Sequence, residues 1–469
     1  MKEKSVRLLI IISAQIFFLF FPYAIFGQER TDSSIATVLD NYLTSANQIS
    51  KFNGTALIAQ NGTILLKKGY GFKNTSTHSL NDTNTIFQIG SLTKSFTSIV
   101  ILKLQEEGKL SVNDKLSKLL PDYPNGDKIT IENLLTHTSG IHNYTEDISE
   151  QDTNIICYPV TRQRVLDVFE NRKLEFKPGT KFAYNNSAFF LLGMIIEKVT
   201  GLQYESVVRK LIFEPLGMSH SGFDYKNLAD TNKAQGYVIF ARDTSREARV
   251  ADSTVYFSAG AIYSTAGDLY KWATAISNHQ LLNDSSWRQA FANYHNNNYG
   301  YGFFVDSVHH KSYIRHSGGG LGLMSDYVYF PKENLIIILL NNFGNYGQSL
   351  FPLAVGISSI VFHLPYAKWT SDPAAVKLDE SQLRKYVGTY EYNADHRLIV
   401  TFKNGNLFIE ATNPKDHLPR LKLYALNETN FYIKEAQLKF GFVNDATNAP
   451  VKLMTYVVEE EKEDWKKIK

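Results

Sequence analysis

The spacing of apolar residues along the chain changes several times, and each change marks a predicted element. Between residues 31 and 49 the apolar positions fall at helical intervals, so this stretch is predicted to form a helix. Two short apolar runs follow at residues 54–60 and 63–68, on either side of Asn61 and Gly62. An Asn-Gly pair between two such runs favours a two-residue turn, so the pattern predicts a β-hairpin.

A strand, a tight turn and a buried helix are predicted next. The extended run at residues 85–89 stops at Gly90, and a strongly apolar segment occupies residues 95–104. Residues 129–140 are then predicted to form a short helix. From there to about residue 283 the pattern is mainly helical, with turns at proline and glycine pairs.

Strand character returns late in this part of the chain. Four consecutive strands are predicted, at residues 299–308, 311–315, 324–330 and 335–340. Strands at the two ends of a domain must pair in one sheet, so the helical stretch between them is predicted to be an insertion. Ser91 and the residues near His316 then lie at the boundary between sheet and helical lobe, which is a natural position for a cleft.

The last hundred residues show a different pattern. A linker is predicted near residues 366–375, where Pro365 and Pro373 interrupt the helical signal. Beyond it, short alternating runs predict a small all-β module of sandwich or barrel type, with strands at residues 386–392, 397–402, 407–410, 431–434, 438–442 and 452–458. No constellation of catalytic residues occurs in this module, and the charged residues 459–469 are predicted to be a solvated tail.

The N-terminus has the anatomy of a secretory signal. Residues 1–7 are basic, residues 8–26 are almost wholly apolar, and the small Gly27 is a plausible cleavage point. Because the apolar run is long for a signal, an uncleaved membrane anchor is the alternative. No cysteine follows the run, which excludes a lipid-anchored lipoprotein. The folded part is therefore expected outside the cytoplasm, either secreted or periplasmic, or anchored to a membrane in the alternative case.

Composition excludes several classes of function. The 469 residues are 43% hydrophobic, and 49 Lys and Arg face 46 Asp and Glu, for a formal net charge of +3. No basic run with interleaved aromatic residues occurs, so no nucleic-acid partner is expected. The single cysteine, Cys157, excludes an internal disulfide and a cysteine-rich metal site, and it is expected to be a buried or half-buried free thiol.

Ser91 and Lys94 are the candidate chemistry at the predicted turn. At a helix N-terminus, unpaired backbone N–H groups and the helix dipole can stabilise an oxyanion, and a lysine three residues later lies on the same face. A serine hydroxyl needs a neighbour to take its proton, and a lysine against an apolar helix core loses preference for its charge. The alternative is a helix-capping serine followed by a solvated lysine.

Tyr184 and Asn186 form the second candidate element. They follow a Pro-Gly turn and precede an apolar helix, so their side chains can point into a cleft from a rigid turn. A tyrosine near a lysine ammonium can ionise more easily and exchange protons with a serine and a leaving group. An asparagine can hold Lys94 and a substrate carbonyl.

His316 begins the third candidate element. It ends a predicted strand and is followed by Ser317 and by three glycines, among them Gly318 and Gly319. Glycines let a substrate approach backbone N–H groups closely, as an oxyanion donor on a strand edge requires. A glycine-rich hairpin turn is the alternative. The other histidines, including His137, His142, His309 and His310, show no ligand spacing and are expected to be structural or surface residues.

Together these stretches resemble the serine β-lactamase and penicillin-recognising family, most closely its class C and D-Ala-D-Ala carboxypeptidase or esterase branch. The matching pieces are Ser91-Leu-Thr-Lys94, residues 134–141, 176–186, 213–218 and 258–269, and His316-Ser-Gly318. The resemblance implies an α/β (α+β) fold, in which an antiparallel sheet is flanked by helices and carries an all-helical lobe. The predicted small all-β domain follows it.

The resemblance also implies roles for the site residues. Ser91 would be the nucleophile, Lys94 its proton acceptor, Tyr184 the acid and base toward the leaving group and the deacylating water, and Asn186 the polar anchor. The oxyanion hole would be the backbone N–H groups of Ser91 and Gly319. Many β-lactamases have lysine where this chain has His316, and a mostly neutral histidine supplies a weaker positive charge for a substrate carboxylate. That difference favours a peptidase, amidase or esterase over a dedicated β-lactamase.

The resulting hypothesis is a serine hydrolase that acts through an acyl-serine intermediate on a D-amino-acid peptide, amide, ester or β-lactam, without metal or organic cofactor. Its substrate would be a small molecule or peptide, such as one derived from the cell wall. The expected domains are a signal peptide (1–27), a hydrolase domain (28–365), a linker (366–375) and a small all-β domain (376–469). The alternatives are a non-catalytic penicillin-binding-like sensor or binding protein, and a C-terminal module that binds cell wall or a partner.

Overall fold

The computed structural model describes residues 34–147, 156–241, 244–344, 349–369, 375–393, 396–412, 418, 420–433, 438–457 and 461–468. The predicted signal peptide lies outside the described residues, and so do residues 370–374 of the predicted linker. Within these described ranges, no helix combines the length and the apolar character that crossing a membrane would require.

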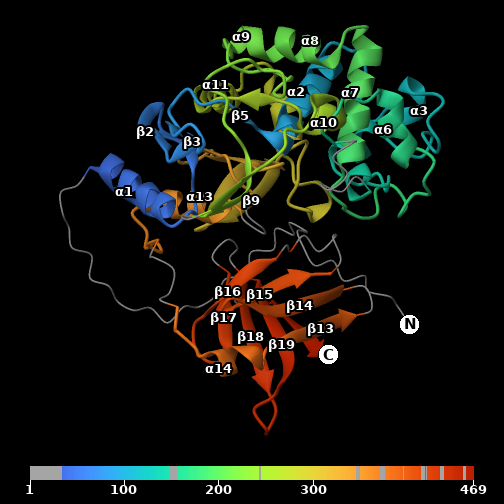
Figure 1. Cartoon of the computed structure of the whole chain (residues 1–469). Helices are drawn as coiled ribbons and strands as arrows, with labels where there is room; N and C mark the ends of the chain where they lie inside the picture. The colour runs from blue at the N-terminus through green and yellow to red at the C-terminus, as the bar shows by residue number, and fades with distance from the viewer. Residues whose placement is uncertain are drawn as a thin grey trace.

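A six-stranded antiparallel sheet forms the centre of the first part of the chain (Figure 1). In spatial order its strands are β2 (Thr63–Tyr70), β1 (Gly54–Gln60), β12 (Leu335–Asn341), β11 (Leu323–Phe330), β10 (Lys311–Gly320) and β9 (Phe304–Val308). Strand β1 pairs with β12 over its full length, from Gly54 opposite Asn341 to Gln60 opposite Leu335. The prediction that early and late strands share one sheet is therefore confirmed.

Strand β12 is buried on both faces, which explains its continuous apolar sequence. Its alternate side chains enter two separate cores. The core on the side of the helical lobe contains Ile336, Ile338 and Leu340. The core on the other face contains Leu335, Ile337 and Leu339, together with side chains of α1 (Ile35–Gln48) and α13 (Phe351–Val361). These two helices pack against each other beside the sheet (Figure 1).

Helices from the middle of the chain form the lobe above the sheet in Figure 1. They are α2 (Thr93–Glu106), α3 (Leu116–Leu119), α4 (Ile131–Leu135), α6 (Arg162–Phe169), α7 (Asn186–Thr200), α8 (Tyr204–Val208), α9 (Glu214–Leu216), α10 (Ser253–Gly260), α11 (Ala266–Ser277) and α12 (Asp284–Ala290). Helix α2 is buried on nearly every side, as its apolar sequence predicts. Cys157 is a buried free thiol, also as predicted.

Among the described residues, three pairs of short strands lie outside the six-stranded sheet. Strand β3 (Phe72–Asn74) pairs with β4 (Ser79–Leu80), and β5 (Phe87–Gln88) pairs with β8 (Tyr263–Ser264). The second pair ties the segment before Ser91 to a segment about 175 residues later. A hairpin of β6 (Tyr237–Ala241) and β7 (Thr244–Glu247) lies within the stretch that was predicted to be mainly helical.

Several predicted boundaries are wrong, and glycines explain most of the differences. Strand β10 does not end at residue 315 but continues through the three glycines, which pair with β11 as far as Gly320 opposite Leu323. The turn between β10 and β11 follows the three glycines, at Gly322, which has φ 68°. Helix α4 ends at Leu135 rather than at residue 140. Strand β9 starts only after Gly302, which has φ 76° and packs against the backbone of Lys94.

The C-terminal part is a closed eight-stranded barrel, coloured orange to red in Figure 1. Its strands are β13 (Gly388–Asn393), β14 (His396–Lys403), β15 (Asn406–Ala411), β16 (Leu421–Ala425), β17 (Asn430–Tyr432), β18 (Leu438–Asn444), β19 (Pro450–Val457) and β20 (Glu461–Lys467). Helix α14 (Glu380–Arg384) precedes it. The barrel has its own apolar core, which includes Tyr390, Phe442 and Trp465.

The prediction of a solvated tail after residue 459 is wrong. Strand β20 pairs with β19 on one side and with β13 on the other, and so closes the barrel. Its Trp465 is fully buried, and the indole Nε1–H donates to Thr455 Oγ1 at 3.3 Å. The density of charged residues hid this strand, and the prediction also missed β16.

Candidate active site

Ser91 lies in a tight turn between β5 and α2. The turn is a short 3₁₀ segment, Gly90–Leu92, that leads directly into the helix. Gly90 has φ 53°, and a Cβ atom there would lie 2.7 Å from the backbone N and O of Gly319. Any larger residue would be excluded on both counts. The turn that carries Ser91 therefore packs directly against β10, at the glycine predicted to border the site.

Lys94 is completely buried one turn farther along α2. Its Nζ lies 3.0 Å from Ser91 Oγ, 2.7 Å from Asn186 Oδ1 and 2.8 Å from the carbonyl oxygen of Ala259. Burial lowers the pKa of this amine well below its ordinary value, because the low-polarity surroundings disfavour the ammonium. The structure thus does not support the alternative of a solvated lysine.

The contacts of Lys94 fix where its lone pair points. A neutral amine has two N–H donors and one lone pair. Two of the three neighbours, Asn186 Oδ1 and the Ala259 carbonyl, can only accept hydrogen bonds, so they take both donors. The lone pair is left for the third neighbour, the hydroxyl of Ser91. This arrangement is suited to removing a proton from Ser91.

Tyr184 completes the contacts around Ser91. Lys94 Nζ lies 4.9 Å from the centroid of its ring. Burial raises the pKa of Tyr184, and a hydrogen bond with Ser91 opposes that shift without cancelling it. The expectation that a nearby lysine eases ionisation of this tyrosine is therefore wrong. Burial removes Tyr184 from water and raises its pKa, and Lys94 favours its neutral form, so no ammonium charge is there to stabilise a phenolate.

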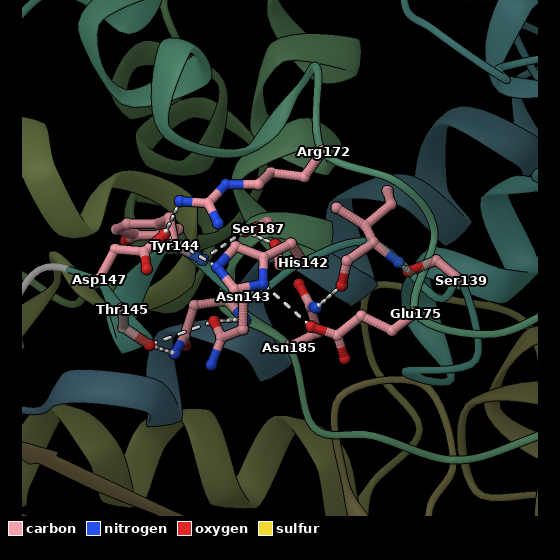
Figure 2. A network of polar contacts seen from close by, with 12 residues as sticks. Ser139, His142, Asn143, Tyr144, Thr145, Asp147, Arg172, Glu175, Asn185 and Ser187 are labelled. Atoms are coloured by element: carbon pink, nitrogen blue, oxygen red, sulfur yellow. Dashed lines mark hydrogen bonds and ion pairs between the residues drawn. The ribbon is translucent and has the colours of Figure 1, made fainter.

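Asn186 is oriented by a neighbouring loop, which Figure 2 shows from close by. Its Nδ2 donates to Thr145 Oγ1 at 3.0 Å, and its backbone N–H donates to Asn143 Oδ1 at 3.0 Å. Thr145 Oγ1 in turn donates to Asn143 Oδ1 at 3.1 Å. The amide nitrogen is thus committed to Thr145, which leaves the amide oxygen for Lys94. Sequence reasoning missed Thr145 and Asn143, since no motif marks them.

The same loop carries a bridging histidine (Figure 2). His142 Nδ1 lies 2.9 Å from Glu175 Oε1, and Nε2 lies 2.8 Å from Asp147 Oδ2, which Arg172 also contacts at 3.0 Å. Burial alone would lower the pKa of His142, but the hydrogen bonds to Glu175 and Asp147 outweigh it and raise the pKa. His142, Glu146 and Glu175 lie close enough for a metal ion. Because both ring nitrogens contact carboxylates, a protonated ring explains the geometry better.

His316 lies on β10 and is almost completely buried. The hydroxyl of Tyr299 lies 3.1 Å from Nε2, and Nδ1 lies 2.6 Å from the carbonyl of Ser317. With both nitrogens engaged in this way, the ring does not bond directly to Ser91. Burial lowers the pKa of His316 to about 3, so the ring is neutral.

Arg315 does not replace the missing charge. It points to the opposite face of β10, where its guanidinium pairs with Asp326 through contacts of 2.8 and 3.0 Å and lies over the ring of Phe351. Near its glycines the strand therefore carries a neutral His316 and an Arg315 whose charge is paired with Asp326. Gly318 packs tightly, since a Cβ there would lie 1.7 Å from the carbonyl of Ile89, whereas the space beside Gly319 is open.

His137 contacts two consecutive residues of the site region, Tyr184 and Asn185. It is fully buried, its Nδ1 accepts a hydrogen bond from the backbone N–H of Asn185 at 3.0 Å, and its ring centroid lies 4.3 Å from that of Tyr184. This is the structural role that was expected. The structure thus brings Ser91, Lys94, Tyr184 and Asn186 into direct contact. It places the His316 ring beside the Tyr184 ring and in contact with Tyr299 rather than with Ser91, and it places Gly319 against the Ser91 turn.

Comparisons with known proteins show the family of the chain. The Beta-lactamase family model matches residues 39–355. The protein PbpX of Bacillus subtilis (strain 168), provisionally named a penicillin-binding protein, is 32% identical over 336 residues, which are 71% of this chain and 78% of PbpX. The teichoic acid D-alanine hydrolase of Staphylococcus aureus (strain MRSA252) is 28% identical over 66% of this chain and 74% of that protein.

A solved structure extends the likeness to most of the chain. The octameric penicillin-binding protein homologue from Pyrococcus abyssi superposes with a TM-score of 0.61 at 23% identity, over 92% of this chain and 99% of that one. At this level of identity the comparison concerns the fold. Because the superposition covers 92% of this chain, it includes residues of the C-terminal barrel as well as the first part of the chain.

Proposed function

The chain belongs to the β-lactamase family, and from that premise we propose that it is a serine hydrolase that forms an acyl-serine intermediate at Ser91. The observation that carries the proposal is the set of contacts of the buried Lys94 amine. Nζ lies 3.0 Å from Ser91 Oγ, beside two carbonyl acceptors that can take both N–H donors of the neutral amine and leave its lone pair for Ser91. A buried neutral amine beside a serine is a general base ready for use at neutral pH.

The acylation step is proposed as follows. Lys94 takes the proton of Ser91 while Oγ attacks the carbonyl carbon of the substrate, and the carbonyl oxygen becomes an oxyanion. The backbone N–H groups of Ser91 and Gly319 are the proposed oxyanion donors, since the turn at Gly90 places these two residues side by side. When the bond to the leaving group breaks, Tyr184 protonates the departing nitrogen or oxygen and regains a proton from Lys94.

The deacylation step reverses these transfers with water. The attacking water gives a proton to the hydroxyl of Tyr184, which at the same time passes its own proton to Lys94. The water oxygen bonds to the acyl carbon, and Ser91 Oγ leaves with the proton that Lys94 returns. A neutral Tyr184 fits a relay role in both steps, because its raised pKa means that it gives up its proton only as it receives another. Asn186 keeps the amine oriented throughout.

The substrate class follows from charge. His316 is neutral, and Arg315 is paired on the other face, so these positions supply no fixed cation for a substrate carboxylate. We therefore place a D-amino-acid ester or amide, or a peptide without a free carboxylate beside the scissile bond, ahead of a β-lactam. The relationship to a teichoic acid D-alanine hydrolase supports a donor derived from the cell wall, and hence a location outside the cytoplasm, secreted or periplasmic.

Intact-mass measurement of acyl adducts tests this proposal. The wild type is incubated with a penicillin, a D-Ala-D-Ala peptide, a D-amino-acid amide and a D-alanyl ester, and Ser91→Ala serves as the control. We expect an adduct on the wild type that Ser91→Ala lacks, together with turnover of at least one ester, amide or peptide. Lys94→Ala should acylate about 10²–10⁴ times more slowly. Equal labelling of Ser91→Ala would refute the nucleophile.

A second outcome of the same panel would favour the other function considered. Stoichiometric labelling by the penicillin without turnover of any donor would indicate a non-catalytic penicillin-binding sensor. The relationship to a protein provisionally named as penicillin-binding makes this comparison worth including.

A further inference from the structure

One residue of α10 leaves helical geometry. Phe257 has φ 41° and ψ −130°, a backbone conformation that glycine adopts readily and that residues with a side chain rarely adopt. Such a conformation persists only where the surroundings enforce it, and it occurs most often beside functional sites. Phe257 lies two residues before Ala259, whose carbonyl contacts Lys94.

The two carbonyl groups that follow the kink point at α2. They lie in the last turn of α10, which ends at Gly260, so they have no N–H partner within the helix and need hydrogen-bond donors from elsewhere. Here the carbonyl of Ser258 accepts a hydrogen bond from Thr97 Oγ1 at 2.7 Å, and the carbonyl of Ala259 accepts one from Lys94 Nζ at 2.8 Å. Both acceptors thus point at α2, and one of them sets the orientation of the Lys94 amine.

The ring of Phe257 is held from several sides. The guanidinium carbon of Arg162 lies 3.3 Å from the ring centroid, and the rings of Phe190 and Tyr204 approach edge-on at 5.2 and 5.1 Å. Phe257 and Arg162 both line a cavity of about 630 Å³, which Tyr204 also lines. Arg162 itself lies 3.6 Å from Glu197.

Helix α7 is also shaped to accept the kink. A Cβ atom on Gly193 would lie 2.5 Å from the Phe257 ring and 2.1 Å from Ser258 Oγ, so only glycine fits there. The same Ser258 hydroxyl donates to the carbonyl of Phe189 at 2.8 Å. The kinked segment is therefore clamped between α7 and α2, with Arg162 on the remaining side.

We propose that Phe257 and Arg162 are positioning residues for the Lys94 base. The Phe257 ring, clamped by the Arg162 guanidinium, maintains the strained turn, and the turn keeps the Ala259 carbonyl on one N–H of Lys94 so that the lone pair faces Ser91. This inference rests on the proposed acyl-serine function. Neither residue touches Ser91, Lys94 or the space beside Gly319, so their effect passes through the backbone of α10.

Two substitutions of Phe257 separate this role from ordinary core packing. Phe257→Gly removes the ring but permits the backbone conformation, whereas Phe257→Ala removes the ring and keeps the conformational cost. We expect Phe257→Ala to acylate about tenfold or more slowly than the wild type, and Phe257→Gly to remain within about threefold of it. Packing alone predicts the reverse order, because glycine fills less space and adds backbone freedom.

The measurement is the acylation rate constant of Ser91 by intact mass, recorded from pH 5 to pH 10, with the melting temperature of each variant taken in parallel. Equal rates for the glycine and alanine variants, or a faster alanine variant, would overturn the proposal. Arg162→Lys keeps a charge near Glu197 but loses the planar stack, so it should slow acylation at every pH with KM unchanged. If the Phe257 variants do not fold, Arg162→Lys still tests the proposal. A wild-type acylation rate for Arg162→Lys would show that the stacked guanidinium does not position Lys94.

The failure of the proposed function would look different. In that case the wild type itself forms no adduct with any acyl donor. If only the positioning role fails, the wild type still forms an adduct, but Phe257→Gly does not acylate faster than Phe257→Ala.

Discussion

The amide of Asn186 lies between two partners that leave it a single orientation: its oxygen is 2.7 Å from the Lys94 amine, and its nitrogen donates to Thr145 at 3.0 Å. A flipped amide would place two donors against each other at Lys94. At Thr145 it would place two acceptors against each other, unless the threonine hydroxyl turned away from Asn143. The orientation therefore depends on a residue from a different loop, and it explains how a buried amine keeps its lone pair directed at Ser91.

Replacing Asn186 with aspartate should shift the pH dependence of acylation. A carboxylate beside Lys94 favours the ammonium form and raises its pKa, typically by about 1–3 units for a close opposite charge. Since Lys94 acts as a base only when neutral, the acid limb of the acylation profile should move to higher pH by a similar amount. Rate constants measured from pH 5 to pH 10 check this. An unmoved limb would show that Asn186 does not touch the base in solution.

Replacing Thr145 tests the second partner of the same amide. Thr145→Ala removes the acceptor for Asn186 Nδ2, so the amide loses its fixed orientation, and we expect acylation to slow by about tenfold, the equivalent of one lost hydrogen bond of roughly 1.4 kcal/mol. Thr145→Ser keeps the hydroxyl and should restore most of the rate. The pair is compared under saturating acyl donor. If serine and alanine behave alike, the hydroxyl is not the orienting group.

The His142 bridge predicts a pH-dependent stability. The pKa of His142 is raised in the folded protein by Glu175 and Asp147, with Arg172 as the neighbouring cation. Its contribution should be fully present below the unfolded value of about 6.5 and should disappear as the pH rises through the folded value. Since the carboxylates are partly exposed, we expect about 0.2–1 kcal/mol.

Melting temperatures of the wild type and of His142→Asn, measured from pH 5 to pH 9, check that contribution. The two curves should differ most at pH 5 and converge at high pH. A constant difference across the range would mean that the ring acts by packing rather than by its charge.

The sequence was sufficient for the parts of the site that lie on one element. Ser91 and Lys94 are three residues apart on a buried helix, so their contact follows from helical geometry and from the apolar residues around them. The partners that orient Lys94 were only partly predictable. Asn186 stands next to a recognisable turn, whereas the Ala259 carbonyl has no side-chain signal, because any residue supplies the same backbone oxygen.

The fold shows the same division. The apolar runs of β1 and β12 predicted their common sheet, since buried strands need partners. The glycines of β10 suggested a turn, but three glycines can pair in a strand when the neighbouring turn at Gly90 needs the space that side chains would fill. Strand β20 was hidden because its charged residues are typical of a tail, and its one strong apolar residue, Trp465, gave no periodicity by itself.

Trp465 also provides a test of whether the barrel is an independent unit. It is fully buried in a core made only of barrel and adjacent residues, and its strand closes the barrel between β13 and β19. Trp465→Ala should destabilise the barrel by about 3–5 kcal/mol, as for other large-to-small changes of buried aromatic residues. Val443→Ala, at a side chain 39% exposed on β18, should change stability by no more than about 0.5 kcal/mol and serves as the control.

The expected result for Trp465→Ala is an early unfolding transition in calorimetry, followed by a second transition at the temperature of the wild type. Acylation of Ser91 should persist between the two transitions, because the residues that contact Ser91 and Lys94 all come from the family-matching part of the chain, residues 39–355. Loss of acylation together with the barrel would contradict this and would mean that the hydrolase site depends on the C-terminal part.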